Sequence, residues 1–283
     1  MDLAEYVLVV EYDGTHYHGF QWQASLPTIQ SELEQAMRRF CGYSSRIMGA
    51  SRTDAGVHAK GQVASFWARR NLSPATLVKA LNYYLPEDIA IKAAYEVDGN
   101  FNVRRHALSR EYHYYILNAN TRSSFSQRFA LFLPKTLDIN MMNEACELVQ
   151  GERDFASFAT SVDNVRSTVR HVYQARICRR KDFIVFHVVA NSFLPHQVRN
   201  TMGLLIRLGM GKISITDFSD IMEAKTLGLA GPMAPAKGLY LTKVNYPKPL
   251  SHFGPSFVVA SNQDSEHSTR KAIAGEALQG MCT

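Results

Sequence analysis

The sequence predicts an α+β fold made of two similar halves, each with a mainly antiparallel sheet. Apolar segments of strand length alternate with amphipathic helical segments, and this strand–helix–strand order occurs twice along the chain. The 283 residues are enough for two domains that each bury a core. From residue 251 onward the chain is rich in small and polar residues and loses its periodicity. We therefore expect an N-terminal half over 1–105, a C-terminal half over 106–250 and a flexible tail over 251–283.

The N-terminal half has turn and cap residues at the ends of its expected elements. Asp13-Gly14 is a turn signal after the first strand. Thr28 is a residue type that caps helix N-termini, and Gly42 is one that ends helices. Pro74 suits the first position of the next helix. The expected strands are 5–11, 45–48, 62–67 and 89–97, and the expected helices are 29–41 and 74–83.

The C-terminal half follows the same alternation of strands and helices. Its expected strands are 110–117, 169–179, 183–190 and 240–246, and its expected helices are 139–149, 195–209 and 216–224. No residue-level repeat relates the two halves, so their similarity is one of architecture.

Composition narrows the class of protein. The net charge of +6 and the pI near 9.1 are compatible with a polyanionic partner such as a nucleic acid. The apolar stretch 6–10 is too short, and too acidic at its edges, for a signal peptide or a membrane helix. The four cysteines are widely spread and form no Cys-x-x-Cys pair. This spacing argues against a structural zinc site or a disulfide framework, and we expect a cytoplasmic protein.

The densest group of polar side chains lies in the segment 51–59, which reads Ser-Arg-Thr-Asp-Ala-Gly-Val-His-Ala. Asp54 stands two residues after Arg52, close enough for the arginine to keep the carboxylate ionised. An ionised carboxylate can act as a nucleophile or as an electrostatic stabiliser at neutral pH. The alternative is an Asp-Ala-Gly turn with a surface ion pair, which would be favoured if this tripeptide stood alone.

Two further segments carry candidate binding residues. Residues 104–115 interleave basic and aromatic side chains, and Tyr112 is a candidate for stacking on an unpaired base. A half-buried strand with a charged entry explains most of the other residues there. Arg199 falls in the first turn of a helix, where the helix dipole disfavours a cation unless an anion is near. It is either solvated or the partner of a carboxylate or a phosphate.

The sequence predicts neither a metal nor a cofactor. His58 has no second ligand at metal spacing, since His16 and His18 lie in another loop and His113 lies far along the chain. The Gly-punctuated aromatic loop 12–23 lacks the glycine spacing and the Lys-Ser/Thr ending of a phosphate-binding loop.

Over residues 5–248 the chain resembles the TruA family of tRNA pseudouridine synthases. Five segments match the family in its order: the loop 12–23, the signature 52–59, the strand start 110–114, the helix start 198–203 and the strand 238–241. The signature usually begins with Gly, and this chain has Ser51 there. The tail after residue 250 lies outside the resemblance.

The resemblance implies a continuous, mainly antiparallel sheet with a central RNA-binding cleft. It also implies Asp54 as the catalytic aspartate, Tyr112 as the tyrosine that stacks on the target base, and Arg52 as the side chain that takes the place of the extruded base. Arg199 corresponds to the arginine that pairs with the aspartate. The family acts as a homodimer on uridines 38–40 of the tRNA anticodon stem-loop, without a cofactor.

Three routes remain open for the chemistry at Asp54. It can act near C1′ or near C6 of the nucleotide, or help to remove the C2′ proton. Two other classes of protein are alternatives: a non-catalytic RNA-binding protein, and an aspartic protease suggested by Thr53-Asp54-Ala55-Gly56. The protease needs two carboxylates that share a proton, and the neighbouring Arg52 opposes that arrangement.

Overall fold

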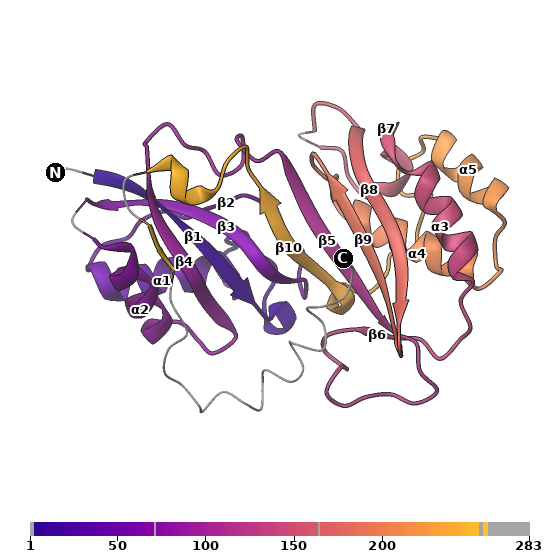
Figure 1. Ribbon diagram of the computed structural model, residues 1–283, viewed down its shortest axis with the longest axis horizontal. Helices are drawn as coiled ribbons and strands as arrows, with labels where there is room; N and C mark the ends of the chain where they lie inside the picture. The colour runs from indigo at the N-terminus through magenta and orange to yellow at the C-terminus, as the bar shows by residue number, and fades with distance from the viewer. Residues whose placement is uncertain (1–2, 71, 164, 255–256, 260–283) are drawn as a thin grey trace. The chain divides into compact units, whose positions relative to one another are not determined.

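The computed structural model describes residues 3–70, 72–163, 165–254 and 257–259. These residues form two compact units, the first from 3–110 with 240–259 and the second from 111–239 (Figure 1). The chain therefore leaves the first unit after Arg110 and returns to it at Tyr240. The strand expected at 240–246 belongs by its contacts to the first unit.

The first unit has a sheet with strand β1 at its centre. Its strands are β1 (Leu3–Tyr12), β2 (Met48–Gly49), β3 (His58–Arg69), β4 (Ile89–Val97), β10 (Leu239–Asn245) and β11 (Phe257–Val259). They lie in the order β11-β4-β1-β3-β10, and β2 pairs with β3. The β1–β3, β1–β4, β2–β3 and β4–β11 pairs are antiparallel, and β10 runs parallel to β3.

Two helices of the first unit confirm the expected caps. Helix α1 (Ile29–Cys41) begins with a capping box in which Thr28 and Ser31 bond to each other's backbone amides. It ends at Gly42, whose φ of 77° is the left-handed conformation that glycine adopts at little cost. Helix α2 (Pro74–Tyr84) is capped by Ser73, and the two helices pack on each other. The unit also has two 3-10 helices, η1 (Gly14–His16) and η4 (Leu250–Phe253).

The second unit has a sheet in the order β5-β9-β8-β7, and Figure 1 shows α3, α4 and α5 gathered beside β8 and β9. Its strands are β5 (Ser109–Leu117), β6 (Leu131–Phe132), β7 (Gly151–Asp154), β8 (Val169–Arg180) and β9 (Phe183–Ala190). Its helices are α3 (Ile139–Leu148), α4 (Gln197–Gly209) and α5 (Ile215–Glu223), with 3-10 helices η2 (Ala156–Phe158) and η3 (Ala236–Gly238). Buried aromatic side chains fill its core, among them Phe155, Phe158, Phe186 and Phe218.

The α+β class with mostly antiparallel strand pairing is confirmed. The strand expected at 45–48 is wrong over most of its length, because only Met48 and Gly49 pair with β3. The amide of Ile47 instead donates to the carboxylate of Glu34, which keeps this backbone out of the sheet. Of the segment expected as a tail, residues 251–253 belong to η4 and 257–259 form β11, while 255–256 and 260–283 lie outside the described residues.

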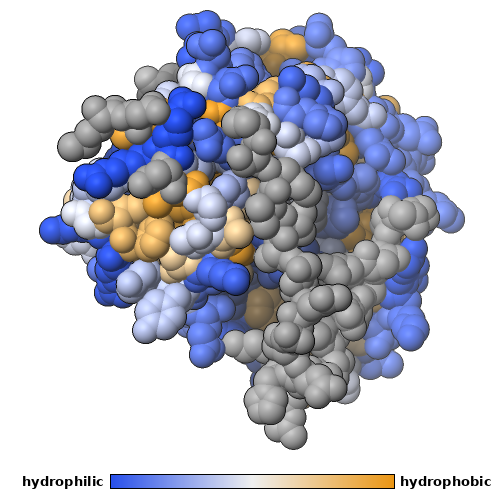
Figure 2. All heavy atoms as spheres, turned by 60° about the vertical axis from the view of Figure 1, so that its left-hand side comes forward, coloured by the Kyte–Doolittle hydropathy of each residue, from blue (hydrophilic) through white to orange (hydrophobic). Residues whose placement is uncertain are grey.

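Hydrophilic side chains cover most of the coloured surface in Figure 2, and apolar side chains appear there in small areas. Such scattered apolar exposure is ordinary for a globular protein. Within the described ranges, no helix is long and apolar enough to cross a membrane.

A glycine in α4 allows another segment of the second unit to approach the helix closely. A Cβ atom at Gly203 would overlap the carbonyl oxygen of Pro232 and lie 3.2 Å from the amide nitrogen of Ala234. The amide of Ala234 also donates to the carbonyl of Arg199, one turn earlier in α4. The segment around Pro232 therefore lies directly on the helix backbone.

Gly203→Ala tests this close approach by whether it raises or lowers the free energy of unfolding. Alanine within a helix normally stabilises a protein by about 0.5–1 kcal/mol relative to glycine. Here we expect destabilisation by about 1–3 kcal/mol, because the new methyl group has no space. The measurement is the free energy of unfolding in urea.

Gly211→Ala is the matched control, since Gly211 has a φ of +68° and no atom within 4 Å of a built Cβ. It measures the cost of the left-handed conformation alone. A Gly203→Ala protein more stable than the wild type would contradict the close-approach explanation.

Candidate active site

The loop that joins β2 to β3 carries two of the predicted site residues. Arg52 is exposed and Asp54 is half-buried, while Thr53 between them is buried. Thr53 thus points into the first unit, and the charged residues on either side of it keep access to solvent. This alternation suits a loop that presents a carboxylate from a fixed backbone.

Hydrogen bonds to the N-terminal loop hold this segment on one side. The hydroxyls of Thr53 and Tyr12 share a buried hydrogen bond of 2.7 Å. The carbonyl of Thr53 accepts from the amide of Phe20 at 3.0 Å, and the amide of Gly56 donates to Tyr17 at 3.2 Å. The loop 12–23, for which the sequence predicted no chemistry, is therefore a support for the Asp54 loop.

A buried glutamine on β3 holds the other side of the loop. The amide of Ser51 donates to Oε1 of Gln62 at 3.2 Å, and the carbonyl of Ser51 accepts from its Nε2 at 2.8 Å. Because a primary amide has both a donor and an acceptor, one side chain satisfies both backbone groups of Ser51. Asp54 closes the turn itself, since its carbonyl accepts from the amide of Val57 at 3.1 Å.

Gly19 explains the close fit of the two loops. Its φ of +89° is unfavourable for other residues, and a Cβ atom there would lie 2.6 Å from the carbonyl oxygen of Thr53. The glycines of the loop 12–23 therefore serve loop packing, which agrees with the absence of a phosphate-binding pattern in the sequence.

His58, the first residue of β3 after the loop, contacts the carboxylate of Asp13. His58 is only 1% exposed, its Nδ1 lies 3.1 Å from Oδ1 of Asp13, and its ring stacks on Tyr240 with centroids 4.7 Å apart. The amide of Gly14 donates to the same Nδ1 at 3.1 Å. Nδ1 accepts from Gly14 when it is unprotonated and donates to Asp13 when it carries a proton.

The surroundings of Asp13 favour its ionised form. Burial by itself raises the pKa of this carboxyl, but hydrogen bonds from His58 and Thr15 outweigh it and hold the pKa well below the usual range. Asp13 and His58 thus form a fixed contact at the start of β3.

Three arginines gather next to the loop in the first unit. The guanidinium of Arg110 is buried and donates to the carbonyls of Ala50 and Arg104, at 3.2 and 2.9 Å. Burial lowers the pKa of Arg104, and the positive charges of Arg52 and Arg110 lower it further. Clustered guanidinium groups create a positive potential that attracts phosphates.

Tyr112 and Arg199 belong to the second unit. Tyr112 is 6% exposed, and its ring meets Phe193 edge-on with centroids 5.2 Å apart. Nε of Arg199, the third residue of α4, donates to the carbonyl of Ala234 at 2.9 Å. The amide of Ala234 donates to the backbone carbonyl of Arg199, so Ala234 holds both the backbone and the side chain of Arg199.

The structure places the four predicted site residues in two pairs. Arg52 and Asp54 share one loop of the first unit, and Tyr112 and Arg199 lie in the second. Sequence reasoning missed the supports of the loop, Tyr12, Asp13, Gln62 and Arg110. Tyr12, Asp13 and Arg110 lie in segments that match the family, but the sequence predicted a structural role only for Asp13-Gly14, as a turn.

Comparisons with known proteins relate most of this chain to one family. A family model described as tRNA pseudouridine synthase matches residues 8–104 and 145–247. The tRNA pseudouridine synthase A of Francisella tularensis (strain SCHU S4 / Schu 4) is 38% identical over 246 residues, which cover 87% of this chain and 95% of the relative. That of Geobacillus kaustophilus is 39% identical over 239 residues, covering 84% and 93%. That of Clostridium kluyveri is 37% identical over 239 residues, covering 84% and 98%.

The α+β fold and a similarity that covers nearly the whole length of these relatives define an RNA-modifying enzyme. The chain belongs to the tRNA pseudouridine synthase family and is therefore an isomerase of tRNA uridines. This confirms the family resemblance found from the five sequence segments.

The depressed pKa of Asp13 has a consequence for acid stability. A carboxylate with a lowered folded pKa stabilises the fold above its unfolded pKa of about 4, and this contribution is lost as the pH falls further. We expect Asp13→Asn to lower the free energy of unfolding at pH 7 by about 1–3 kcal/mol. At pH 3 the difference from the wild type shrinks.

Urea unfolding at the two pH values measures this effect. Asp182→Asn, in the exposed turn between β8 and β9, is the control and is expected to change little at either pH. An Asp13→Asn deficit of equal size at pH 3 and pH 7 would contradict a lowered pKa of Asp13 in the folded protein.

Gln62→Met tests how far catalysis depends on the position of the loop. Methionine has a similar volume but cannot make the two hydrogen bonds to Ser51, so we expect faster amide exchange in 50–57. We also expect kcat to fall by about 10- to 100-fold, because small displacements of a reacting group are costly. Gln35→Met on the exposed side of α1 is the control. An unchanged kcat in Gln62→Met would mean that this clamp does not position the site.

Proposed function

We propose that this isomerase converts uridines 38–40 of the tRNA anticodon stem-loop to pseudouridine, with Asp54 as its nucleophile. The observation that carries the proposal is the loop itself. Its backbone is anchored through Ser51, Thr53 and Gly56, yet Asp54 is half-buried and not enclosed. A carboxylate on a fixed backbone is preorganised for attack, which lowers the cost of orientation in the transition state.

The reaction breaks the N1–C1′ glycosidic bond and forms a bond between C1′ and C5 of the same base. The base keeps all its heavy atoms: N1 gains a proton, and the proton from C5 goes to solvent. No electrons enter or leave, so the proposal needs no redox cofactor. Asp54 supplies the carboxylate that acts at C1′ or C6 or assists removal of the C2′ proton.

The other three predicted residues complete the proposed site. The target uridine must first leave its stack, at a cost of roughly a few kcal/mol. Arg52, exposed beside Asp54, takes the vacated position, and Tyr112 packs against the base. Phe193 supports the ring of Tyr112 from its edge. The proposal gives Arg199, which is oriented through its bond to Ala234, the role of electrostatic partner of the Asp54 carboxylate.

Charge and assembly belong to the same proposal. The cluster of Arg52, Arg104 and Arg110 attracts the phosphates of the stem-loop next to Asp54. We propose that the chain works as a homodimer in the cytoplasm, with each tRNA touching both subunits.

The central test is release of tritium from tRNA labelled at C5 of uridine. Asp54→Asn keeps the size of the side chain and removes its charge, so we expect the rate to fall by at least about 10³-fold. Binding of the tRNA by gel shift is expected to stay within about threefold, because phosphates supply most of the affinity. Equal release from both proteins would remove Asp54 from the mechanism.

Two controls separate the parts of the proposal. Asp182→Asn is expected to release tritium at the wild-type rate. Mapping pseudouridine in the same tRNA tests the positions: modification outside 38–40 would overturn the proposed specificity and leave the isomerase activity intact. Affinity without any release from the wild type would favour a non-catalytic RNA-binding protein.

A further inference from the structure

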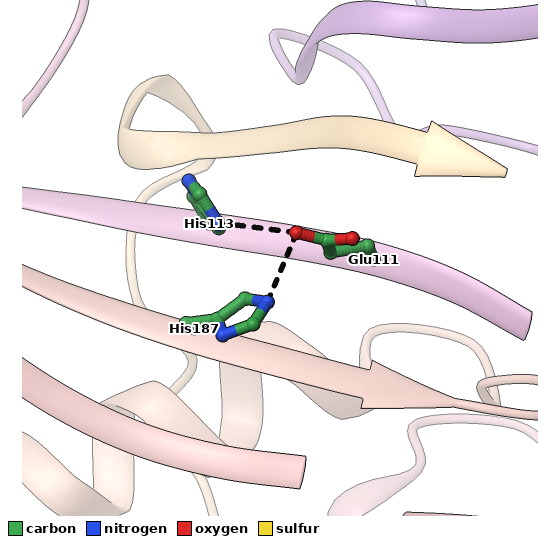
Figure 3. A group of neighbouring side chains, drawn as sticks. All are labelled: Glu111, His113 and His187. Atoms are coloured by element: carbon green, nitrogen blue, oxygen red, sulfur yellow. Dashed lines mark hydrogen bonds and ion pairs between the residues drawn. The ribbon is translucent and has the colours of Figure 1, made fainter. Parts of the chain in front are cut away.

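Three side chains with metal-ligand chemistry converge in the second unit (Figure 3). Glu111 and His113 come from β5 and His187 comes from β9. Oε1 of Glu111 lies 3.0 Å from Nε2 of His187 and 3.6 Å from Nε2 of His113. The three potential ligand atoms all lie within 4.8 Å of one another.

This group lies on the face of the strands opposite Tyr112. Successive side chains of a strand alternate between faces, so Glu111 and His113 share one side and Tyr112 points to the other. On β9, Phe186 and Val188 line a small cavity with Val198 and Thr201 of α4, so His187 faces away from the helix. Glu111 and His113 remain partly exposed, which gives an ion a path to them.

The spacing of the three atoms is close to that of a metal site. Bonds of about 2.0–2.2 Å to Zn²⁺ in tetrahedral geometry place neighbouring ligand atoms about 3.2–3.6 Å apart. The two separations from Glu111 lie near this range. The ligand atoms of the two imidazoles lie within 4.8 Å of each other and must approach by up to about 1.5 Å to close the site. Two residues of one strand and one of another provide a rigid base for such a site.

The charges of the group also suit a cation. Hydrogen bonds from His113 and His187 hold the pKa of the Glu111 carboxyl well below its usual range, so it is anionic at neutral pH. Nε2 of His113 and Nε2 of His187 provide the other two ligand atoms, and an imidazole nitrogen binds a metal only without its proton.

Two features limit the affinity of this group for a metal ion. Nδ1 of His187 is buried without a hydrogen-bond partner, and it must carry the proton when Nε2 binds a metal. Leaving that N–H unpaired weakens binding roughly ten- to hundredfold. Arg176, opposite His187 in the β8–β9 register, adds a positive charge on the same side.

We propose that Glu111, His113 and His187 bind one divalent transition-metal ion of the zinc class, with a fourth position open to water. The ion links β5 to β9 and stabilises the second unit. It lies on the opposite face of β5 from Tyr112, and no step of the uridine chemistry passes through it. The sequence predicted no metal, because spacing was informative only around His58. His187 joins Glu111, 76 residues earlier in the chain, only when β9 pairs with β5.

The test uses the full chain without an affinity tag, stripped with a chelator and titrated with Co²⁺ at pH 7.5. We expect one ion per chain with an affinity on the order of micromolar, visible d–d absorption and no thiolate charge-transfer band. Zn²⁺ is expected to displace Co²⁺ and raise the melting temperature. At pH 5.5 the affinity falls at least tenfold, because protonated imidazoles do not bind metals.

Variants assign the ligands. Glu111→Gln and His113→Gln are each expected to weaken Co²⁺ binding at least tenfold, with unchanged circular dichroism as the check on folding. His252→Gln, at an exposed histidine of η4, is the matched control. Three results would overturn the proposal: a thiolate charge-transfer band, wild-type affinity for Co²⁺ in either ligand variant, or no binding by the wild type up to about 1 mM Co²⁺.

Discussion

The position of Asp54 depends on one buried hydrogen bond, between the hydroxyls of Thr53 and Tyr12. It joins the last residue of β1 to the loop before β3, so the two neighbouring strands fix the loop from below. Gln62 and Phe20 then hold the loop at its two sides. A carboxylate on such a support needs little reorganisation, which suits the role proposed for Asp54.

Most elements of the fold could be predicted because local signals define them. Thr28 and Gly42 bound α1, Pro74 opens α2, and the strands at 89–97 and 183–190 have the expected ends. The failures have tertiary causes. The backbone around Ile47 bonds to a side chain of α1, and the strand after Tyr240 pairs with β3 of the first unit, far back in the chain.

The candidate site, like the fold, could be predicted from the sequence only in part. Arg52 and Asp54 stand in one short signature, so the sequence alone could single them out. Their supports could not be found, because Tyr12, Gln62 and Arg110 act through backbone groups that become neighbours only in the folded unit. The group around Glu111 was missed for the same reason, since strand pairing brings its third member from another part of the chain.

The late return of the chain to the first unit matters for its synthesis on the ribosome. Residues 3–110 contain the Asp54 loop, but β3 receives its parallel partner only when β10 has been made, some 130 residues later. Until then the ring of His58 lacks Tyr240, on which it stacks. A nascent chain that ends inside the second unit therefore carries the whole 52–59 signature on an incomplete support, and this support is completed only after β10 has been made.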